Sequence, residues 1–380
     1  MHIAYVSSFD PHNVSSWSGT GYFIAEALKN TQHKVSFIGP LTENGALLSK
    51  LRQQFYASIF QKKHIRGFDE NILQGYARQI AKQLHRVQPD VIFSVWSLPI
   101  IDLETDIPIS FTADALFSLM KDFYPDWSNI TEATKINGIN SDIKSLAKAS
   151  AAIYCSDWVA DEAIQQYKTP KEKVHVVPYG ANIHKDFIPN AQQVIRTSRQ
   201  DSCSLLFLGV DWRRKGGDIV FNTLKHLRNS GVNAELTICG CVPPKEVAEH
   251  KYVKVIPYLN KNNKSDLHVL CTLLKESAFL FLPTRAEAFG IVFCEASAFG
   301  LPSISTSVGG VSTAVKNNVN GYLLPYEAQH EDYAKLICDI WYDTSRYTSL
   351  SESSRLLYEN ELNWDIAIAK ISTILEGIAK

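Results

Sequence analysis

The stretch FLPTRAEAFGIVFCEASAFG at residues 281–300 decides the fold of this chain. An apolar run ends at a Pro-Thr pair and a helical pattern follows, so the stretch predicts a strand, a short loop and a helix. Glu287 lies in the predicted loop, and Glu295 follows eight residues later, about two turns down the helix and on nearly the same face. Both carboxylates can therefore contact one ligand.

The start of this predicted helix is a candidate anion site. Residues 288–291, AFGI, would form its first turn, whose backbone N–H groups lack partners within the helix. A helix start that contains glycine favours phosphate binding. A ligand with phosphates at this turn and hydroxyl-bearing groups near Glu287 and Glu295 has the outline of a nucleotide sugar. On its own, the glutamate spacing also fits two ordinary surface side chains.

Length and composition indicate the class of protein in which this ligand site lies. A chain of 380 residues favours two domains of about 150 to 200 residues each. The net charge of −1 gives no basic field for nucleic acid. Seven scattered cysteines indicate reduced core thiols in a cytosolic protein. The start of the sequence lacks the features of a signal peptide and no apolar run reaches membrane-spanning length, which predicts a soluble or at most peripheral protein.

Short apolar runs alternate with helical patterns in both halves of the chain. Strands are predicted at 2–7, 34–39, 90–96, 107–112, 151–155 and 174–177, and then at 204–208, 234–239, 253–256, 279–282, 303–306 and 321–324. This order predicts an α/β fold of two Rossmann-like, doubly wound domains facing across a cleft. The polar segment 189–202 is interpreted as the linker, so the predicted domains are 1–190 and 200–362.

The first half offers two weaker candidates for ligand contact. Gly19, Thr20 and Gly21 lie between the first strand and the helix predicted at 22–29, where α/β sheets bring backbone close to phosphate. The alternative is a tight turn that needs positive φ. Asp114 follows the strand at 107–112 and is a candidate polar group in the cleft, or else an N-cap for the next segment.

Residues 47–86 are helical in pattern and locally basic, with aromatic side chains interleaved. Such a segment can lie on anionic lipid, which makes a peripheral membrane contact one interpretation. The other is a helix with one solvated face and one face in the core.

A second phosphate element is predicted at residues 209–217, GVDWRRKGG, between the first strand and first helix of the second half. Its glycines let the backbone approach a ligand closely. Arg213, Arg214 and Lys215 supply positive charge for a diphosphate. The alternative is a charged, exposed turn.

The block EAFGIVFCEASAFGLPSISTSVGG from Glu287 onward resembles the E-x7-E signature of the retaining GT-B glycosyltransferases of family 4. The resemblance extends over nearly the whole chain. Further matching segments occur in family order: WSGTGYF at 17–23, SFTADALF at 110–117, YCSDWVAD at 154–161, VVPYGAN at 176–182, and NWD at 363–365.

The resemblance implies a GT-B fold and transfer of a hexose from a UDP- or GDP-sugar with retention of configuration, with no metal or other cofactor required. It places the donor sugar on Glu287, the ribose on Glu295 and the diphosphate on Lys215. It also implies that the last helix, about 364–380, packs back on the first, acceptor-binding domain. Further donor contacts are implied at the backbone amides of Phe289, Gly290 and Ile291, and for the base near Tyr258 and Leu259.

Two positions depart from the family pattern. Val210 stands where many relatives have arginine, so the guanidinium role passes to Arg213 or Arg214. Many relatives also carry a histidine in the first-domain cleft, where this chain has Thr112, Ala113 and Asp114, so Asp114 is the candidate catalytic residue there.

The expected acceptor is a glycan or lipid-linked sugar, as in surface-polysaccharide or glycolipid assembly, and the expected location is the cytoplasm or the inner face of the membrane. Two other functions fit the same residues. One is a nucleotide-sugar epimerase or hydrolase of the same fold, and the other is a non-catalytic subunit that binds nucleotide sugars. The intact Glu287, Glu295 and Lys215 argue against the latter.

Overall fold

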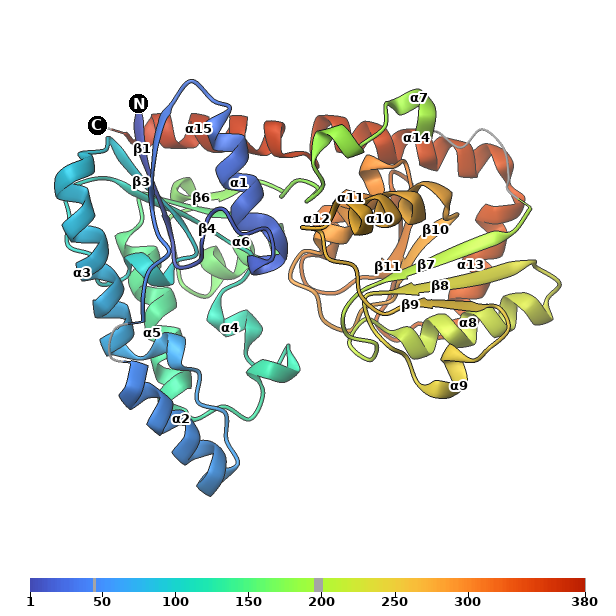
Figure 1. The fold of residues 1–380 in the computed structure, drawn as a ribbon, viewed down its shortest axis with the longest axis horizontal. Coiled ribbons are helices and arrows are strands. Elements are labelled where there is room, and N and C mark those ends of the chain that lie inside the picture. Colours follow the sequence, from blue (N-terminus) through green and yellow to red (C-terminus); the bar gives the residue numbers. More distant parts are fainter. Residues whose placement is uncertain (44–45, 195–200, 380) are drawn as a thin grey trace. The chain divides into compact units, whose positions relative to one another are not determined.

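The computed structural model describes residues 1–43, 46–194 and 201–379. Their contacts divide the chain into two compact units. Unit 1 comprises residues 1–177 and 367–380, and unit 2 comprises residues 178–366. Each unit has a six-stranded parallel sheet with helices beside it (Figure 1), which confirms the prediction of two Rossmann-like domains. The twelve predicted strands all appear within two residues of their expected bounds.

Unit 1 is built on the strand order β2-β1-β3-β4-β5-β6. Its strands are β1 (His2–Ser7), β2 (Lys34–Ile38), β3 (Val91–Val95), β4 (Ile109–Ala113), β5 (Ala151–Tyr154) and β6 (Val174–Val176). Its helices are α1 (Thr20–Lys29), α2 (Ala46–Phe60), α3 (Glu70–Val87), α4 (Phe117–Met120), α5 (Glu132–Lys148) and α6 (Asp157–Gln165). The region 47–86 is therefore two helices, separated by a break that includes the 3-10 turn η2 (Arg66–Phe68).

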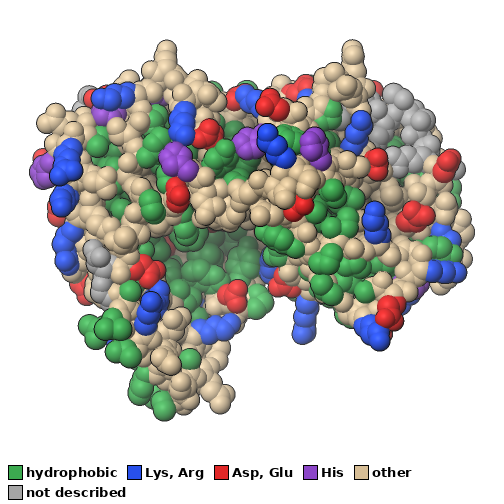
Figure 2. Space-filling model, viewed as in Figure 1, with side chains coloured by type: hydrophobic (Ala, Val, Ile, Leu, Met, Phe, Trp, Pro, Cys, Tyr) green, Lys and Arg blue, Asp and Glu red, His purple; other side chains and the backbone are tan. Residues whose placement is uncertain are grey.

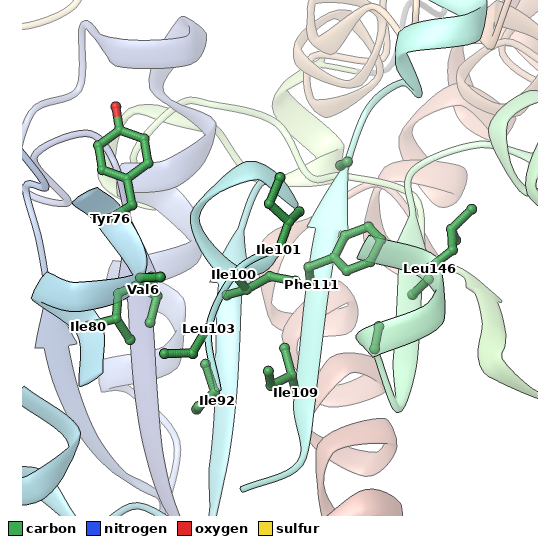
Figure 3. Close-up of a cluster of buried hydrophobic side chains, with 14 of the residues drawn as sticks. Val6, Tyr76, Ile80, Ile92, Ile100, Ile101, Leu103, Ile109, Phe111 and Leu146 are labelled. Atoms are coloured by element: carbon green, nitrogen blue, oxygen red, sulfur yellow. The ribbon is translucent and has the colours of Figure 1, made fainter. Parts of the chain in front are cut away.

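The core of unit 1 forms around central strands that are buried on both faces, as in a parallel sheet covered by helices. All five residues of β3 and of β4 are buried. Helix α3 buries one apolar face against this sheet, and the short segment after β3 closes the cluster. Figure 3 shows side chains of this cluster from β1, α3, β3, the segment after β3, β4 and α5: Val6, Tyr76, Ile80, Ile92, Ile100, Ile101, Leu103, Ile109, Phe111 and Leu146.

Unit 2 is built on the order β12-β11-β10-β7-β8-β9. Its strands are β7 (Cys203–Leu208), β8 (Ala234–Cys239), β9 (Val253–Ile256), β10 (Phe279–Leu282), β11 (Ser303–Thr306) and β12 (Gly321–Leu324). Counted from β7, this is the order 3-2-1-4-5-6 of the dinucleotide-binding fold. The direction of winding reverses between β7 and β10, so the loops after these two strands flank the topological switch point, where open α/β sheets bind ligands.

The helices of unit 2 are α7 (Ala191–Val194), α8 (Gly217–Asn229), α9 (Lys245–Ala248), α10 (Lys264–Glu276), α11 (Ile291–Ala298), α12 (Val311–Ala314), α13 (His330–Tyr342) and α14 (Thr344–Asn360). Helix α15 (Trp364–Ile378) starts in unit 2, and its residues from Ala367 onward belong to unit 1.

The observed division lies at Val177/Pro178, whereas the sequence placed the end of the first domain at residue 190. Residues after Pro178 belong to unit 2 because they pack on the start of α15. Tyr179 stacks on Trp364 with ring centroids 5.6 Å apart, and Trp364 Nε1 donates to Asn182 Oδ1 at 2.9 Å. Gly180 lies so close that a Cβ atom there would be 2.4 Å from the Trp364 nitrogen. Part of the predicted linker, residues 195–200, lies outside the described residues.

Candidate functional site

Two loops at the switch point of unit 2 lie against each other. One joins β7 to α8 and carries Arg213, Arg214 and Lys215, and the other joins β10 to α11 and carries Glu287. The Arg285 N–H donates to the Arg214 carbonyl at 2.7 Å, which ties the loop backbones together. The phosphate element and the glutamate loop predicted from sequence are therefore brought to one place.

Lys215 and Glu287 form an ion pair there. Lys215 Nζ donates to Glu287 Oε2, and both side chains are largely buried. Arg214 adds a second cation, since its Nη1 lies 3.8 Å from Glu287 Oε2 and donates to the Ala286 carbonyl at 2.9 Å. Arg214 also pairs with Asp211, whose Oδ2 lies 3.8 Å from Arg214 Nε, so two cations and two carboxylates meet at these loops. The two cations are the groups that could contact a diphosphate.

The structure separates the two arginines that the sequence left as alternatives. Arg213 is exposed. Its backbone carbonyl accepts a hydrogen bond from Arg285 Nη1 at 2.6 Å. Arg214 is the residue directed at Glu287. Val210 is 70% exposed.

The start of α11 differs from the expected one. The helix begins at Ile291, not at Ala288, because Gly290 takes the left-handed conformation (φ +89) as the N-cap. Phe289 is buried before the helix, with its ring 5.6 Å from the Tyr179 ring. Of the predicted amides, the one at Ile291 belongs to the first turn and the one at Gly290 to the cap, whereas the Phe289 amide lies outside the helix.

Glu295 lies within α11 and is almost fully buried. Its carboxylate accepts a hydrogen bond from Lys261 Nζ. Burial raises the pKa of Glu295, and the Lys261 charge and the backbone N–H of Asn182 act in the opposite direction. Lys261 follows β9 in the loop that carries the predicted base-binding residues Tyr258, which is exposed, and Leu259, which is half-buried.

Lys261 was not singled out from the sequence. The available signal was its position after β9, because loops that follow parallel strands lie at the ligand-binding edge. Lys261 and Glu295 are 34 residues apart in sequence, and their contact is made by the flexible lysine side chain. No local sequence pattern predicts such a contact.

Of the predicted Gly19, Thr20 and Gly21 in unit 1, only Gly19 lies in a turn with positive φ, and Thr20 and Gly21 are the first residues of α1. Trp17, Ser18 and Gly19 have φ of 48°, 55° and 90°, and Gly19 is the N-cap of α1. A phosphate contact at this turn stays a prediction.

Asp114 lies beside this turn, where its Oδ2 accepts a hydrogen bond from Trp17 Nε1 at 3.0 Å. A different carboxylate, Asp142, accepts hydrogen bonds from the backbone amides at the start of the next helix, α4: Phe117 N–H at 3.1 Å and Ser118 N–H at 3.2 Å. A catalytic role for Asp114 stays a prediction. The described residues contain no cluster of three or more side chains suited to hold a metal ion, and metal independence likewise stays a prediction.

The glycine after Lys215 gives a prediction about stability. Gly216 has φ +75, and a Cβ atom there would lie 2.0 Å from the Pro283 carbonyl oxygen. We expect Gly216→Ala to lower the free energy of unfolding by at least about 2 kcal/mol through backbone strain and this clash. Gly231 is the matched control, because it has φ +84 with no atom within 4 Å of the added Cβ. Equal losses in the two variants, measured by denaturant unfolding, would show that the contact with Pro283 contributes nothing.

Comparison with known proteins adds independent information. The family model "Glycosyl transferases group 1" matches residues 191–357, and "Glycosyltransferase Family 4" matches residues 22–185. The D-inositol 3-phosphate glycosyltransferase of Jonesia denitrificans is 26% identical over 252 residues, which cover 60% of this chain and 57% of that protein. The chain spans about half the length of the curated relatives it matches.

Solved structures share the fold. The sucrose-phosphate synthase of Thermosynechococcus elongatus has a TM-score of 0.69 at 17% identity and covers 99% of this chain and 98% of its own. HepE of Anabaena, solved in complex with UDP and glucose, has a TM-score of 0.65 at 14% identity, covering 99% and 100%. At these identities the likeness establishes the GT-B fold alone.

Proposed function

The chain belongs to glycosyltransferase family 4, of the group 1 glycosyl transferases, and we propose that it transfers a hexose from a nucleoside-diphosphate sugar to a hydroxyl group of a glycan or glycolipid. The observation that carries this proposal is the ion pair of Lys215 with Glu287, with Arg214 beside it, at the switch point of unit 2. A bound donor would place its diphosphate on the two cations and its sugar on the carboxylate.

The proposed catalytic effect is electrostatic. When the bond from the anomeric carbon to phosphate breaks, positive charge develops on the sugar and negative charge on the leaving diphosphate. Lys215, Arg214 and the amides at Gly290 and Ile291 would stabilise the diphosphate. Because these groups are already held in place by the two loops, little reorganisation is needed during the reaction.

Retention of configuration requires no protein base in this proposal. The acceptor oxygen forms its bond to the anomeric carbon on the face from which the diphosphate leaves. The hydroxyl proton passes to the departing phosphate oxygen, so atoms and charges balance. Unit 1 is proposed to bind the acceptor, with Asp114 as its candidate polar group.

The donor can be identified before the acceptor is known. We expect one class among UDP- and GDP-hexoses to be hydrolysed slowly by the protein without any acceptor, and the rate to rise when the correct glycan or lipid-linked acceptor is added. Release of nucleoside diphosphate measures both. Conversion of the donor to an epimer, or tight nucleotide binding with no turnover for any donor and acceptor pair, would contradict the proposal and favour the epimerase or the non-catalytic subunit.

Lys261 yields a prediction about pH. If Glu295 accepts the ribose hydroxyls as a carboxylate, nucleotide affinity falls as the pH falls through its raised pKa. Lys261→Met removes a charge that lowers this pKa, so affinity should be lost at a higher pH than in the wild type. Lys261→Arg should keep the wild-type profile. Titration calorimetry at a series of pH values measures the affinity of each variant for the nucleoside diphosphate. If affinity depends on pH in the same way in the wild type and in Lys261→Met, Lys261 does not control the protonation of Glu295.

A further inference from the structure

Helix α2 of unit 1 exposes an unusual number of large apolar side chains. Within its 15 residues, six such side chains are 55–72% exposed: Leu47, Leu48, Leu51, Phe55, Ile59 and Phe60. Ser49 is the one buried residue of this helix. Figure 2 shows hydrophobic side chains gathered over α2 at the lower left, and Figure 1 shows α2 lying away from the sheet of unit 1.

Five of these side chains form one continuous face. Leu47, Leu51, Phe55 and Ile59 recur every four residues, and Leu48 lies beside them, so all five fall on one side of the helix. The side of α2 that faces the protein is a different one. It contains Ser49 and Tyr56, whose ring stacks on the buried His64 with centroids 5.6 Å apart. Helix α2 therefore contacts the rest of unit 1 through Ser49 and Tyr56, and its apolar face stays exposed to solvent.

The charges around this face all have one sign. Residues 46–68 contain no aspartate or glutamate. Lys50 and Arg52, both exposed, flank the apolar face, and Lys62, Lys63 and Arg66 follow the helix. Two of these five already have partners, since Lys63 Nζ donates to the Pro125 carbonyl and Arg66 pairs with Glu43. Lys62 lies within electrostatic reach of the Glu132 carboxylate. Lys50 and Arg52 are therefore the two cations that flank the apolar face itself.

The neighbouring helix α3 does not share this property. Its apolar residues, among them Ile72, Ile80 and Leu84, are buried in the core of unit 1. Within the basic region 47–86, α3 is therefore a core helix with a solvated outer face. Contact with anionic lipid remains an interpretation only for α2 and the residues that follow it.

We propose that α2 is an interfacial membrane anchor that lies flat on an anionic lipid surface, with Leu47, Leu51, Phe55 and Ile59 in the acyl boundary. Lys50 and Arg52 would reach the headgroup phosphates, because long basic side chains extend along an apolar surface and keep their charge in the polar layer. A second copy of this chain fits less well, since pairing two such faces would bring like charges together without carboxylates between them. No helix among the described residues is long and apolar enough to span a membrane. The inference does not depend on the donor.

Vesicle sedimentation with the full chain tests this anchor. We expect the wild type to bind vesicles containing phosphatidylglycerol at least about tenfold better than vesicles of pure phosphatidylcholine, and added salt to weaken the binding. The triple variant Leu51→Gln, Phe55→Gln, Ile59→Gln keeps helix propensity and removes the apolar face, so it should bind anionic vesicles at least about tenfold less well. Lys50→Gln with Arg52→Gln should remove most of the preference for anionic lipid.

Matched substitutions elsewhere control for these changes. Leu356 on α14 is 56% exposed, like Phe55, and the Lys245 side chain is 84% exposed, so Leu356→Gln and Lys245→Gln should bind vesicles as the wild type does. Donor hydrolysis and thermal unfolding should be unchanged in every variant. Equal binding by wild type and triple variant, equal binding to both kinds of vesicle, or a wild-type dimer that the triple variant converts to a monomer while vesicle binding persists, would each overturn the anchor.

Discussion

Replacing Lys215 by methionine should lower kcat/KM for sugar transfer by about 10²- to 10³-fold, the usual loss when one preorganised charge or donor is removed from a developing anion. The Lys215 side chain is largely buried at the switch point and points at Glu287, so methionine keeps its stem and removes only its charge. The affinity for the free nucleoside diphosphate should fall as well, because the proposed contact is to the diphosphate. Steady-state kinetics and titration calorimetry give the two numbers.

A loss of activity in Lys215→Met has a second possible cause, which a double variant separates. Methionine leaves Glu287 partly buried without its main partner, and breaking one half of a buried pair costs stability. Lys215→Met with Glu287→Gln removes both charges, so it should recover most of the lost stability. Because Glu287 is itself proposed to hold the donor sugar, this variant measures the stability cost alone. The kcat/KM of Lys215→Met is therefore measured below its unfolding temperature, where wild-type activity of the folded variant would show that Lys215 acts only in folding.

Replacing Glu287 by glutamine should have a comparable effect on transfer and a different effect on nucleotide binding. We expect kcat/KM to fall by at least about 10²-fold, because the carboxylate is proposed to hold the donor sugar. The affinity for the free nucleoside diphosphate should stay the same or rise, since the variant frees Lys215 from its ion pair.

The signature of the proposed site is a fall in diphosphate affinity in Lys215→Met with no fall in Glu287→Gln. Full transfer activity in Glu287→Gln, or a loss of diphosphate affinity equal to that in Lys215→Met, would remove the assignment of the sugar to Glu287. Thermal unfolding of each variant checks that the fold is intact.

The sequence predicted those features that depend on local pattern. Strand β10 is a continuous apolar run and β3 is apolar apart from Ser94. Short apolar runs of this kind are typical of strands in a parallel sheet that is covered on both faces. The meeting of Lys215 with Glu287 followed from topology, because both come directly after strands that lie next to each other at the switch point.

Other features depend on long-range contacts that no local pattern contains. The start of α11 moved to Ile291 because Gly290 is left-handed, and a glycine in sequence does not reveal which conformation it takes. The contact of Lys261 with Glu295 is made by a flexible side chain across 34 residues. The apolar face of α2 has the same spacing whether it is buried or exposed, so only the packing of unit 1 showed that nothing within the described part of that unit covers it.

A crystal structure of the full chain with the nucleoside diphosphate of the donor found by hydrolysis tests the central claim most directly. The account predicts diphosphate oxygens within hydrogen-bond distance of Lys215 Nζ and the Arg214 guanidinium, the ribose hydroxyls on Glu295, and the base beside Leu259. A diphosphate bound elsewhere on the chain, with the ion pair of Lys215 and Glu287 unchanged, would contradict it.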